Sequence, residues 1–308
     1  MENIAFVFPG QGSQTLGMLA ELAESHAVVG QTFAEASEVL GYDLWALVQQ
    51  GPVETLNETD KTQPALLAAS VAIWRAYVAS GKAMPAMLAG HSLGEYSALV
   101  CAGVMDFKDA IKLVELRGQL MQQAVPAGTG AMYAIIGLDN DGIANACTEA
   151  AQGEVVSPVN FNSPGQVVIA GQKDAVERAA AACKAAGAKM AVALPVSVPS
   201  HCALMKPAAD KLAVALNDVQ FNEPKITVIN NVDVASPTAV ADIKDALVRQ
   251  LYCPVRWSET VELMAEKGIT QLVECGPGKV LTGLAKRINK SLSAQAVNDV
   301  ASFTALTE

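Results

Sequence analysis

Five consecutive residues, Gly90-His91-Ser92-Leu93-Gly94, have the G-x-S-x-G spacing of a nucleophile elbow. Apolar residues 86–89 precede them and a helix-like segment over 95–101 follows, which is the strand–turn–helix context that the motif requires. The two glycines permit a tight, strained turn that lifts the Ser92 hydroxyl out of a sheet. The Leu93 N–H then lies near the start of a helix, where it can donate to an oxyanion. The sequence therefore predicts that Ser92 is a nucleophile.

A serine hydroxyl is a weak nucleophile without a base, and the chain offers three histidines. His201 follows the last strand of an expected small domain, at a domain junction where clefts form, and we predict that it is the base. We expect His91 to point away from its neighbour Ser92 and to support the loop, and His26 to be solvated. Spacing alone identifies no acid that would orient the histidine. Cys202 could form a Cys–His pair, but no elbow surrounds it, so we expect it to be a small buried side chain.

Arg117 lies among apolar residues that are spaced as on one face of a helix over 109–123. Its guanidinium would either extend to the surface or bind an anion, and its planar fork suits a carboxylate. The apolar pattern alone favours the surface position.

A glycine-rich loop over 9–17 follows the first expected strand, and we expect Gln11 in this loop to supply a second oxyanion donor. A dinucleotide site is disfavoured because Thr15 stands where G-x-G-x-x-G requires glycine. The loop over 276–279 does not match a P-loop, since Val280 stands where serine or threonine is required. We therefore expect no nucleotide site in either loop, and no cofactor.

The composition excludes several classes of protein. The chain has 308 residues, of which 51% are hydrophobic and 17% charged, which indicates a globular protein. Its formal net charge of -10 disfavours a general nucleic-acid binder, and no apolar run reaches membrane-spanning length. The six cysteines form no C-x-x-C pair, which disfavours zinc and redox motifs. Since no leader pattern is visible at the first residues, we expect a cytoplasmic protein without a metal, a nucleic-acid partner or a membrane partner.

The order of the expected elements predicts an α/β protein with two domains. Residues 128–197 follow the order β-α-β-β-α-β, the ferredoxin-like pattern, and form an expected insert. Residues 1–127 and 198–308 form the main domain around the elbow. Expected strands of the main domain cover 4–8, 86–89, 225–230 and 271–274. Its expected helices cover 16–50, 63–80, 95–101, 109–123, 202–217, 242–250, 259–267 and a segment ending at 288.

Six segments together carry a resemblance to a known family. They read FPGQGSQ, TQPA, GHSLGE, LRG, NFNSPG and VPSH, and they cover residues 8–14, 62–65, 90–95, 116–118, 160–165 and 198–201. In content and order, over essentially the whole chain, they resemble the malonyl-CoA:acyl carrier protein transacylases of bacterial fatty acid synthesis. The resemblance implies an α/β-hydrolase-like domain with a ferredoxin-like insert, in agreement with the element order.

The resemblance also implies a reaction and a role for each site residue. Malonyl-CoA and holo acyl carrier protein would be the substrates, and the malonyl group would pass through an ester on Ser92. His201 would act as base and then as acid, and the free malonyl carboxylate would bind Arg117. The other implied roles belong to Gln11 and Leu93 in the oxyanion hole, to the backbone carbonyl of Gln250, which orients the histidine, and to Gln63, which lines the site.

Three other interpretations stay open at this point. A serine thioesterase or esterase of the same core fold explains the elbow, but neither Arg117 nor the missing acid. A scaffold that binds acyl carrier protein would not need a strained elbow. An acyltransferase of a polyketide pathway shares these motifs and is not separated from the fatty acid enzyme by sequence.

A carrier protein would need a docking surface on this acidic chain. Acyl carrier proteins are acidic as a class, so two like-charged proteins require a local basic patch to meet. The candidates are a cluster near the chain's end, Lys286, Arg287 and Lys290, and a pair in the insert, Lys184 and Lys189.

Overall fold

Strand β1 (Ile4–Phe8) is the centre of a parallel five-stranded sheet with the order β7-β2-β1-β8-β9. The computed structural model describes residues 3–196 and 198–308. The other strands of this sheet are β2 (Met87–Gly90), β7 (Thr227–Ile229), β8 (Gln271–Cys275) and β9 (Ser293–Val297). Because all these strands are parallel, their carboxyl ends lie at one edge of the sheet, and β2 delivers the elbow there.

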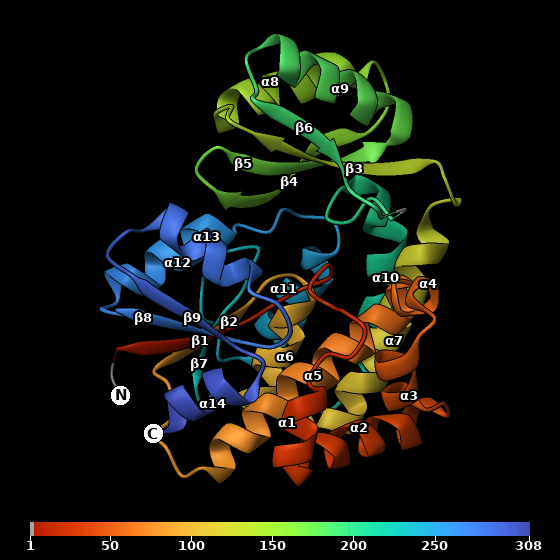
Figure 1. Ribbon diagram of the computed structural model, residues 1–308. Helices are drawn as coiled ribbons and strands as arrows, with labels where there is room; N and C mark the ends of the chain where they lie inside the picture. Colours follow the sequence, from red (N-terminus) through yellow and green to blue (C-terminus); the bar gives the residue numbers. More distant parts are fainter. Residues whose placement is uncertain (1–2, 197) are drawn as a thin grey trace.

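Helices cover both faces of the parallel sheet (Figure 1). One face of β1 presents Phe6 and Phe8 to the larger core, which includes α5 (Thr59–Ala79). The other face presents Ala5 and Val7 to a second core. Burial on both faces explains why β1 is an unbroken apolar run rather than an alternating one. The remaining helices of the main domain are α1 (Ala20–Ser25), α2 (Ala27–Leu40), α3 (Leu44–Gln50), α4 (Val53–Leu56), α6 (Leu93–Cys101), α7 (Phe107–Ala124), α10 (Lys206–Leu216), α11 (Val240–Gln250), α12 (Trp257–Glu266), α13 (Val280–Ile288) and α14 (Val300–Thr307), with a short 3-10 turn η1 (Ala203–Met205).

The small domain is an antiparallel four-stranded sheet with two helices on one face. Its strands lie in the order β4-β5-β3-β6, which is the ferredoxin-like topology that the sequence predicts. Figure 1 shows α8 and α9 on the outer side of this sheet and the main domain on its other side. The elements are β3 (Gly130–Ile136), α8 (Asn140–Ala151), β4 (Val156–Ser163), β5 (Gln166–Gln172), α9 (Lys173–Ala185) and β6 (Met190–Ala193).

The predicted fold class is confirmed, and the insert lies between the end of α7 at Ala124 and the start of η1 at Ala203. We keep residues 128–197 as the proposed extent of the insert. Residue 197, its last residue, lies outside the described residues.

Two parts of the main domain differ from the sequence prediction. The helical stretch expected over 16–50 is three helices. His26 is extended, with φ -131° and ψ 98°, and separates α1 from α2, and Gly41 adopts a left-handed conformation with φ 76° that ends α2. Strand β9 and helix α14 were not expected at all. β9 reads SAQAV at the edge of the sheet, where partial exposure removes the need for a strong apolar run.

Candidate active site

Ser92 occupies a strained turn between β2 and α6. Its backbone has φ 52° and ψ -109°, which side-chain-bearing residues rarely adopt. A Cβ on Gly90 would lie 1.8 Å from the carbonyl carbon of Gly94, and a Cβ on Gly94 would lie 2.1 Å from the carbonyl oxygen of Phe8. No side chain fits at either position, so the glycines of the motif are required by close backbone approach.

His201 lies within hydrogen-bond reach of Ser92. Its Nε2 is 2.8 Å from Ser92 Oγ, and its Nδ1 is 2.6 Å from the backbone oxygen of Gln250. A carbonyl oxygen only accepts, so Nδ1 carries the proton and Nε2 is free to accept one from Ser92. A backbone carbonyl therefore stands where many catalytic triads place an acid.

The surroundings of His201 keep its imidazole neutral. The side chain is 3% exposed, and burial lowers its pKa to about 3, with a smaller lowering by the positive charge of Arg117. The Gln250 carbonyl opposes this shift only in part. A neutral imidazole at neutral pH is the form that can take the serine proton.

The side chains of the other candidates from the sequence have partners other than Ser92. His91 points away from Ser92, as expected, and its Nε2 contacts Asn162 Oδ1 of the small domain at 2.8 Å. His26 packs its ring 4.5 Å from that of Phe303 and is half-buried, so the expectation of a solvated side chain is met only in part. Cys202 is buried, as expected, and burial raises the pKa of its thiol to about 11.

Arg117 is buried, with 1% of its surface exposed, so the surface position favoured by the helix pattern is wrong. The pattern misses this because the partners of Arg117 come from α5 and α11, far away in sequence. Its guanidinium donates to Gln63 Oε1 at 2.8 Å, to Gln250 Oε1 at 2.9 Å and to Ser92 Oγ at 3.3 Å. Gln63 therefore accepts a hydrogen bond from Arg117, and it is not among the described residues that line the cleft.

The guanidinium of Arg117 has only neutral acceptors. None of the ion pairs among the described residues includes it, and its Nε finds no hydrogen-bond partner among them. The guanidinium carbon Cζ of Arg117 lies 5.3 Å from the ring centroid of Tyr96. This contact stabilises the cation but does not neutralise its charge. A buried cation with a free donor beside the Ser92 hydroxyl is suited to hold an anionic group.

Two backbone N–H groups near Ser92 fit an oxyanion hole. Leu93 begins α6, and Gln11 lies in the turn after β1; both residues line the same cleft as Ser92. Over residues 3–196 and 198–308, neither N–H donates a hydrogen bond. Both donors are therefore available to a substrate oxygen.

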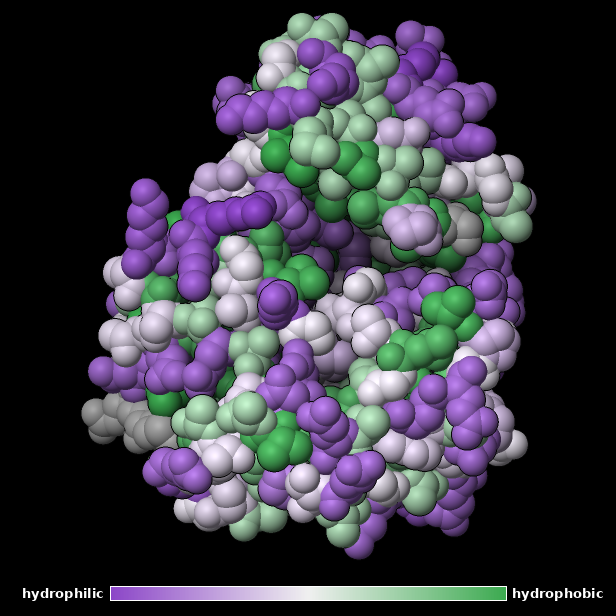
Figure 2. Space-filling view, in the orientation of Figure 1, coloured by the Kyte–Doolittle hydropathy of each residue, from purple (hydrophilic) through white to green (hydrophobic). Residues whose placement is uncertain are grey.

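The cleft lies where the two domains meet. The main domain lines it with Gln11, Thr59, Ser92, Arg117 and His201, among others, and the small domain adds Met132, Asn160, Leu194 and Val196. Figure 2 shows the surface hollowed below the small domain. Apolar side chains on one wall and polar groups on the other suit a short acyl group with a charged end.

Two residues that sequence reasoning missed hold the elbow from below. Asn231, the second residue after β7, accepts from the Ser92 N–H through Oδ1 at 2.7 Å and donates to Gly90 O through Nδ2 at 2.7 Å. Glu95 accepts from the Asn231 N–H at 3.0 Å. The available signal was the pair Asn230-Asn231 at the end of the expected strand over 225–230.

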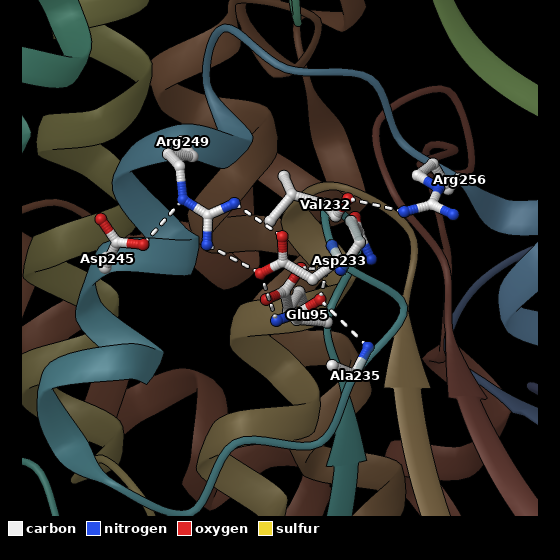
Figure 3. Close-up of polar contacts among 9 residues, drawn as sticks. Glu95, Val232, Asp233, Ala235, Asp245, Arg249 and Arg256 are labelled. Carbon is white, nitrogen blue, oxygen red and sulfur yellow. Dashed lines mark hydrogen bonds and ion pairs between the residues drawn. The ribbon is translucent and has the colours of Figure 1, made fainter.

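An ion pair lies close to these residues. Figure 3 shows Arg249 of α11 donating to both carboxylate oxygens of Asp233, at 2.8 and 2.7 Å, with Glu95 beside this pair.

The structure shows neither a metal centre nor a membrane span within the residues it describes. No three side chains among histidine, cysteine, aspartate and glutamate lie close enough together there to hold a metal ion. No helix in the described ranges combines the length and the apolar character needed to cross a membrane.

Comparison with known proteins places this geometry in a family. The family described as "Acyl transferase domain" matches residues 5–306. The malonyl CoA-acyl carrier protein transacylase of Escherichia coli (strain K12) is 67% identical over 308 residues, which is 100% of both chains.

Solved structures agree. An acyl carrier protein S-malonyltransferase from Vibrio cholerae is 74% identical, with a TM-score of 0.98 over 99% of this chain and 100% of the other. A malonyl-transacylase in complex with its type II PKS acyl-carrier protein is 70% identical, with a TM-score of 0.98 over 98% of each chain. The chain belongs to the acyl transferase family, among the malonyl CoA-acyl carrier protein transacylases.

Proposed function

We propose that this chain transfers the malonyl group of malonyl-CoA to the phosphopantetheine thiol of holo acyl carrier protein, through an ester on Ser92, and so supplies fatty acid synthesis. The observation that carries the proposal is the pairing of Ser92 and His201 beside the buried Arg117, whose hydrogen-bond acceptors are all neutral. The names of the relatives support the same reaction and the same two substrates.

The first half-reaction forms the ester. His201 Nε2 accepts the hydroxyl proton as Ser92 Oγ attacks the thioester carbonyl. The tetrahedral oxyanion accepts hydrogen bonds from the N–H groups of Leu93 and Gln11. The C–S bond then breaks, and the imidazolium returns its proton to the departing thiolate of coenzyme A.

The second half-reaction runs through the same atoms in reverse. The phosphopantetheine thiol gives its proton to His201 and attacks the ester carbonyl. The bond between the acyl carbon and Ser92 Oγ breaks, and Ser92 regains the proton. The Gln250 carbonyl keeps His201 in one tautomer during both halves, since it accepts from Nδ1 at 2.6 Å.

Arg117 makes the site selective for an acyl group that carries a carboxylate. The malonyl carboxylate would pair with the guanidinium, and an acetyl group would leave this buried charge without a carboxylate in direct contact. This selectivity is what a thioesterase or esterase interpretation leaves unexplained.

A polyketide pathway is the second candidate for the carrier protein's origin. It is favoured by the likeness to a transacylase in complex with a type II PKS acyl-carrier protein, at 70% identity. The chemistry at Ser92 is the same for both carriers. We include a cytoplasmic location in the proposal, since the cysteines are free thiols.

The transfer is tested by following the malonyl group from malonyl-CoA with and without a holo carrier protein. We expect malonyl carrier protein to form rapidly, and free malonate to form slowly when the carrier is absent. Release of malonate at an equal rate in both mixtures would show a hydrolase instead. Comparing a fatty acid carrier with a polyketide carrier, by kcat/KM, decides between the two pathways.

A further inference from the structure

Glu95 is a buried carboxyl group that the mechanism above leaves without a role. It lies in the first turn of α6, and its side chain is 2% exposed. No ion pair among the described residues includes it. Its Oε2 accepts from Gln250 Nε2 at 2.8 Å and from the Asn231 N–H at 3.0 Å. A carboxylate in a protein interior is costly, so its presence under the nucleophile calls for an explanation.

Gln250 connects Glu95 to all three main groups of the site. Its backbone oxygen accepts from His201, its Oε1 accepts from Arg117 at 2.9 Å, and its Nε2 donates to Ser92 O at 3.1 Å. The Ser92 carbonyl and an ionised Glu95 can only accept, so Nε2 must face both of them. Oε1 is then left to face Arg117, whose N–H groups can only donate. The charge of Glu95 thus favours the one amide orientation that satisfies Arg117.

Asn231 connects Glu95 to the elbow backbone. The Asn231 N–H donates to Glu95, while the Asn231 side chain holds the Ser92 N–H and the Gly90 carbonyl, both at 2.7 Å. These bonds bracket the residue with φ 52°. Strained backbone persists only where the surroundings over-determine it.

The geometry points to Glu95 as a positioning residue of the transfer, whose buried negative charge acts on Ser92, His201 and Arg117 through Gln250 and Asn231. The inference rests on the proposed function. The same charge stabilises the imidazolium that His201 becomes when it takes the serine proton. Glu95 does from a distance what the acid of a catalytic triad does in direct contact with the histidine.

The charge on Glu95 can be removed by pH. The pKa of Glu95 is raised to about 7, and burial is the largest cause. The contacts with Gln250 and Asn231 and the charge of Arg117 act in the opposite direction, whereas the charge of Asp233 adds to the rise. The phenol of Tyr96 also lies near Glu95, and it stays neutral because its pKa is raised to about 12. Asp233 is itself paired with Arg249. Above about pH 7 Glu95 is charged and the site is fully active; below it the carboxyl is protonated and the rate falls.

The acidic limb of the rate profile can be assigned because His201 titrates elsewhere. Burial lowers the pKa of His201 to about 3, so loss of the base occurs far below the limb expected from Glu95. At low malonyl-CoA the acylation rate reports kcat/KM, and a limb in kcat/KM belongs to the free enzyme.

The test is single-turnover acylation of Ser92 by malonyl-CoA across the neutral pH range, in wild type, Glu95→Gln, Glu95→Asp and Glu274→Gln. In Glu95→Gln the side-chain oxygen can still accept from Gln250 and Asn231, so these two hydrogen bonds are kept while the charge is lost. We expect the acylation rate constant to fall about tenfold at the alkaline plateau, the effect of one unit charge over several ångströms of protein interior. Malonyl-CoA binding should be nearly unchanged, and the limb near pH 7 should be absent.

Two variants separate charge from packing. Glu95→Asp keeps the charge, so it should still show a limb in the pH profile. Its acylation rate should lie between those of Glu95→Gln and wild type. Glu274→Gln is the matched control: Glu274 is also fully buried and accepts from the N–H groups of Leu281 and Thr282, at 3.1 and 2.7 Å, away from the cleft. It should keep the wild-type limb.

Two results would overturn the inference, and a third would overturn the proposed function on which it rests. A Glu95→Gln variant with the wild-type rate and limb would overturn the inference. So would a loss that is independent of pH, appears mainly as weaker binding and is not recovered by Glu95→Asp, since that is the behaviour of a packing role. If wild type itself is not acylated on Ser92, the proposed function fails first, and the comparison between variants is not what refutes it.

Discussion

Replacing Arg117 with alanine should lower the preference of the site for a malonyl over an acetyl group. In the wild-type protein the guanidinium is 1% exposed and contacts only neutral oxygens, from Gln63, Gln250 and Ser92. A malonyl carboxylate supplies the missing anion, whereas an acetyl group does not. Arg117→Ala removes both the attraction for malonyl and the penalty for acetyl.

The size of this effect follows from the contacts of the guanidinium. A bidentate, charge-assisted pair in a water-poor site contributes about 2–5 kcal/mol. The neutral acceptors and the Tyr96 ring already stabilise part of the charge, so the lower half of that range applies. About 2–3 kcal/mol corresponds to roughly 30- to 150-fold in the ratio of kcat/KM for malonyl-CoA over acetyl-CoA.

The assay is that ratio in wild type, Arg117→Ala, Arg117→Lys and the control Arg178→Ala. Arg117→Lys should recover only part of the malonyl rate, because a point charge lacks the planar fork. Arg178 pairs with Glu154 in the small domain, and its loss should leave the ratio unchanged. A ratio that stays the same in an active Arg117→Ala variant would refute the assignment, since the carboxylate would then be held elsewhere.

Two further predictions concern the base and the carrier protein. His201→Ala should slow acylation by several orders of magnitude. His91→Ala should have a far smaller effect, because the His91 ring contacts Asn162 and Trp257 and not Ser92. Stopped-flow acylation of both folded variants checks this, and a larger loss from His91→Ala would reverse the assignment. If a basic cluster docks the carrier protein, reversing its charge should raise the KM for holo carrier protein and leave the KM for malonyl-CoA unchanged. Equal effects on the two KM values would show that the cluster is not the docking surface. The exposed clusters to compare are Lys286 and Arg287 on α13 with Lys290 just after this helix, and Lys184 and Lys189 in the small domain.

The parts of the site that the sequence could predict are those carried by short contiguous motifs. The elbow needs only its own glycines and the adjoining strand and helix, so Ser92 and Leu93 could be placed from local pattern. The ferredoxin-like insert could be predicted for the same reason, because its element order alone specifies it.

Contacts between distant segments could not be predicted from local pattern. Arg117 was expected at the surface because its helix shows one apolar stripe, yet its partners are 54 residues away in Gln63 and 133 residues away in Gln250. Asn231 lies before a stretch, residues 233–245, in which no motif is recognisable. Its contact with Glu95 spans 136 residues and arises only when β7 pairs with β2.

The most direct test of the central claim is the intact mass of the protein after mixing with malonyl-CoA. We predict a gain of one malonyl group in wild type, located on Ser92 by peptide mapping and lost when holo carrier protein is added. Ser92→Ala, folded by circular dichroism, should gain nothing. A malonyl adduct that persists in Ser92→Ala, or one that forms on wild type but does not pass to the carrier thiol, would contradict the transfer through Ser92.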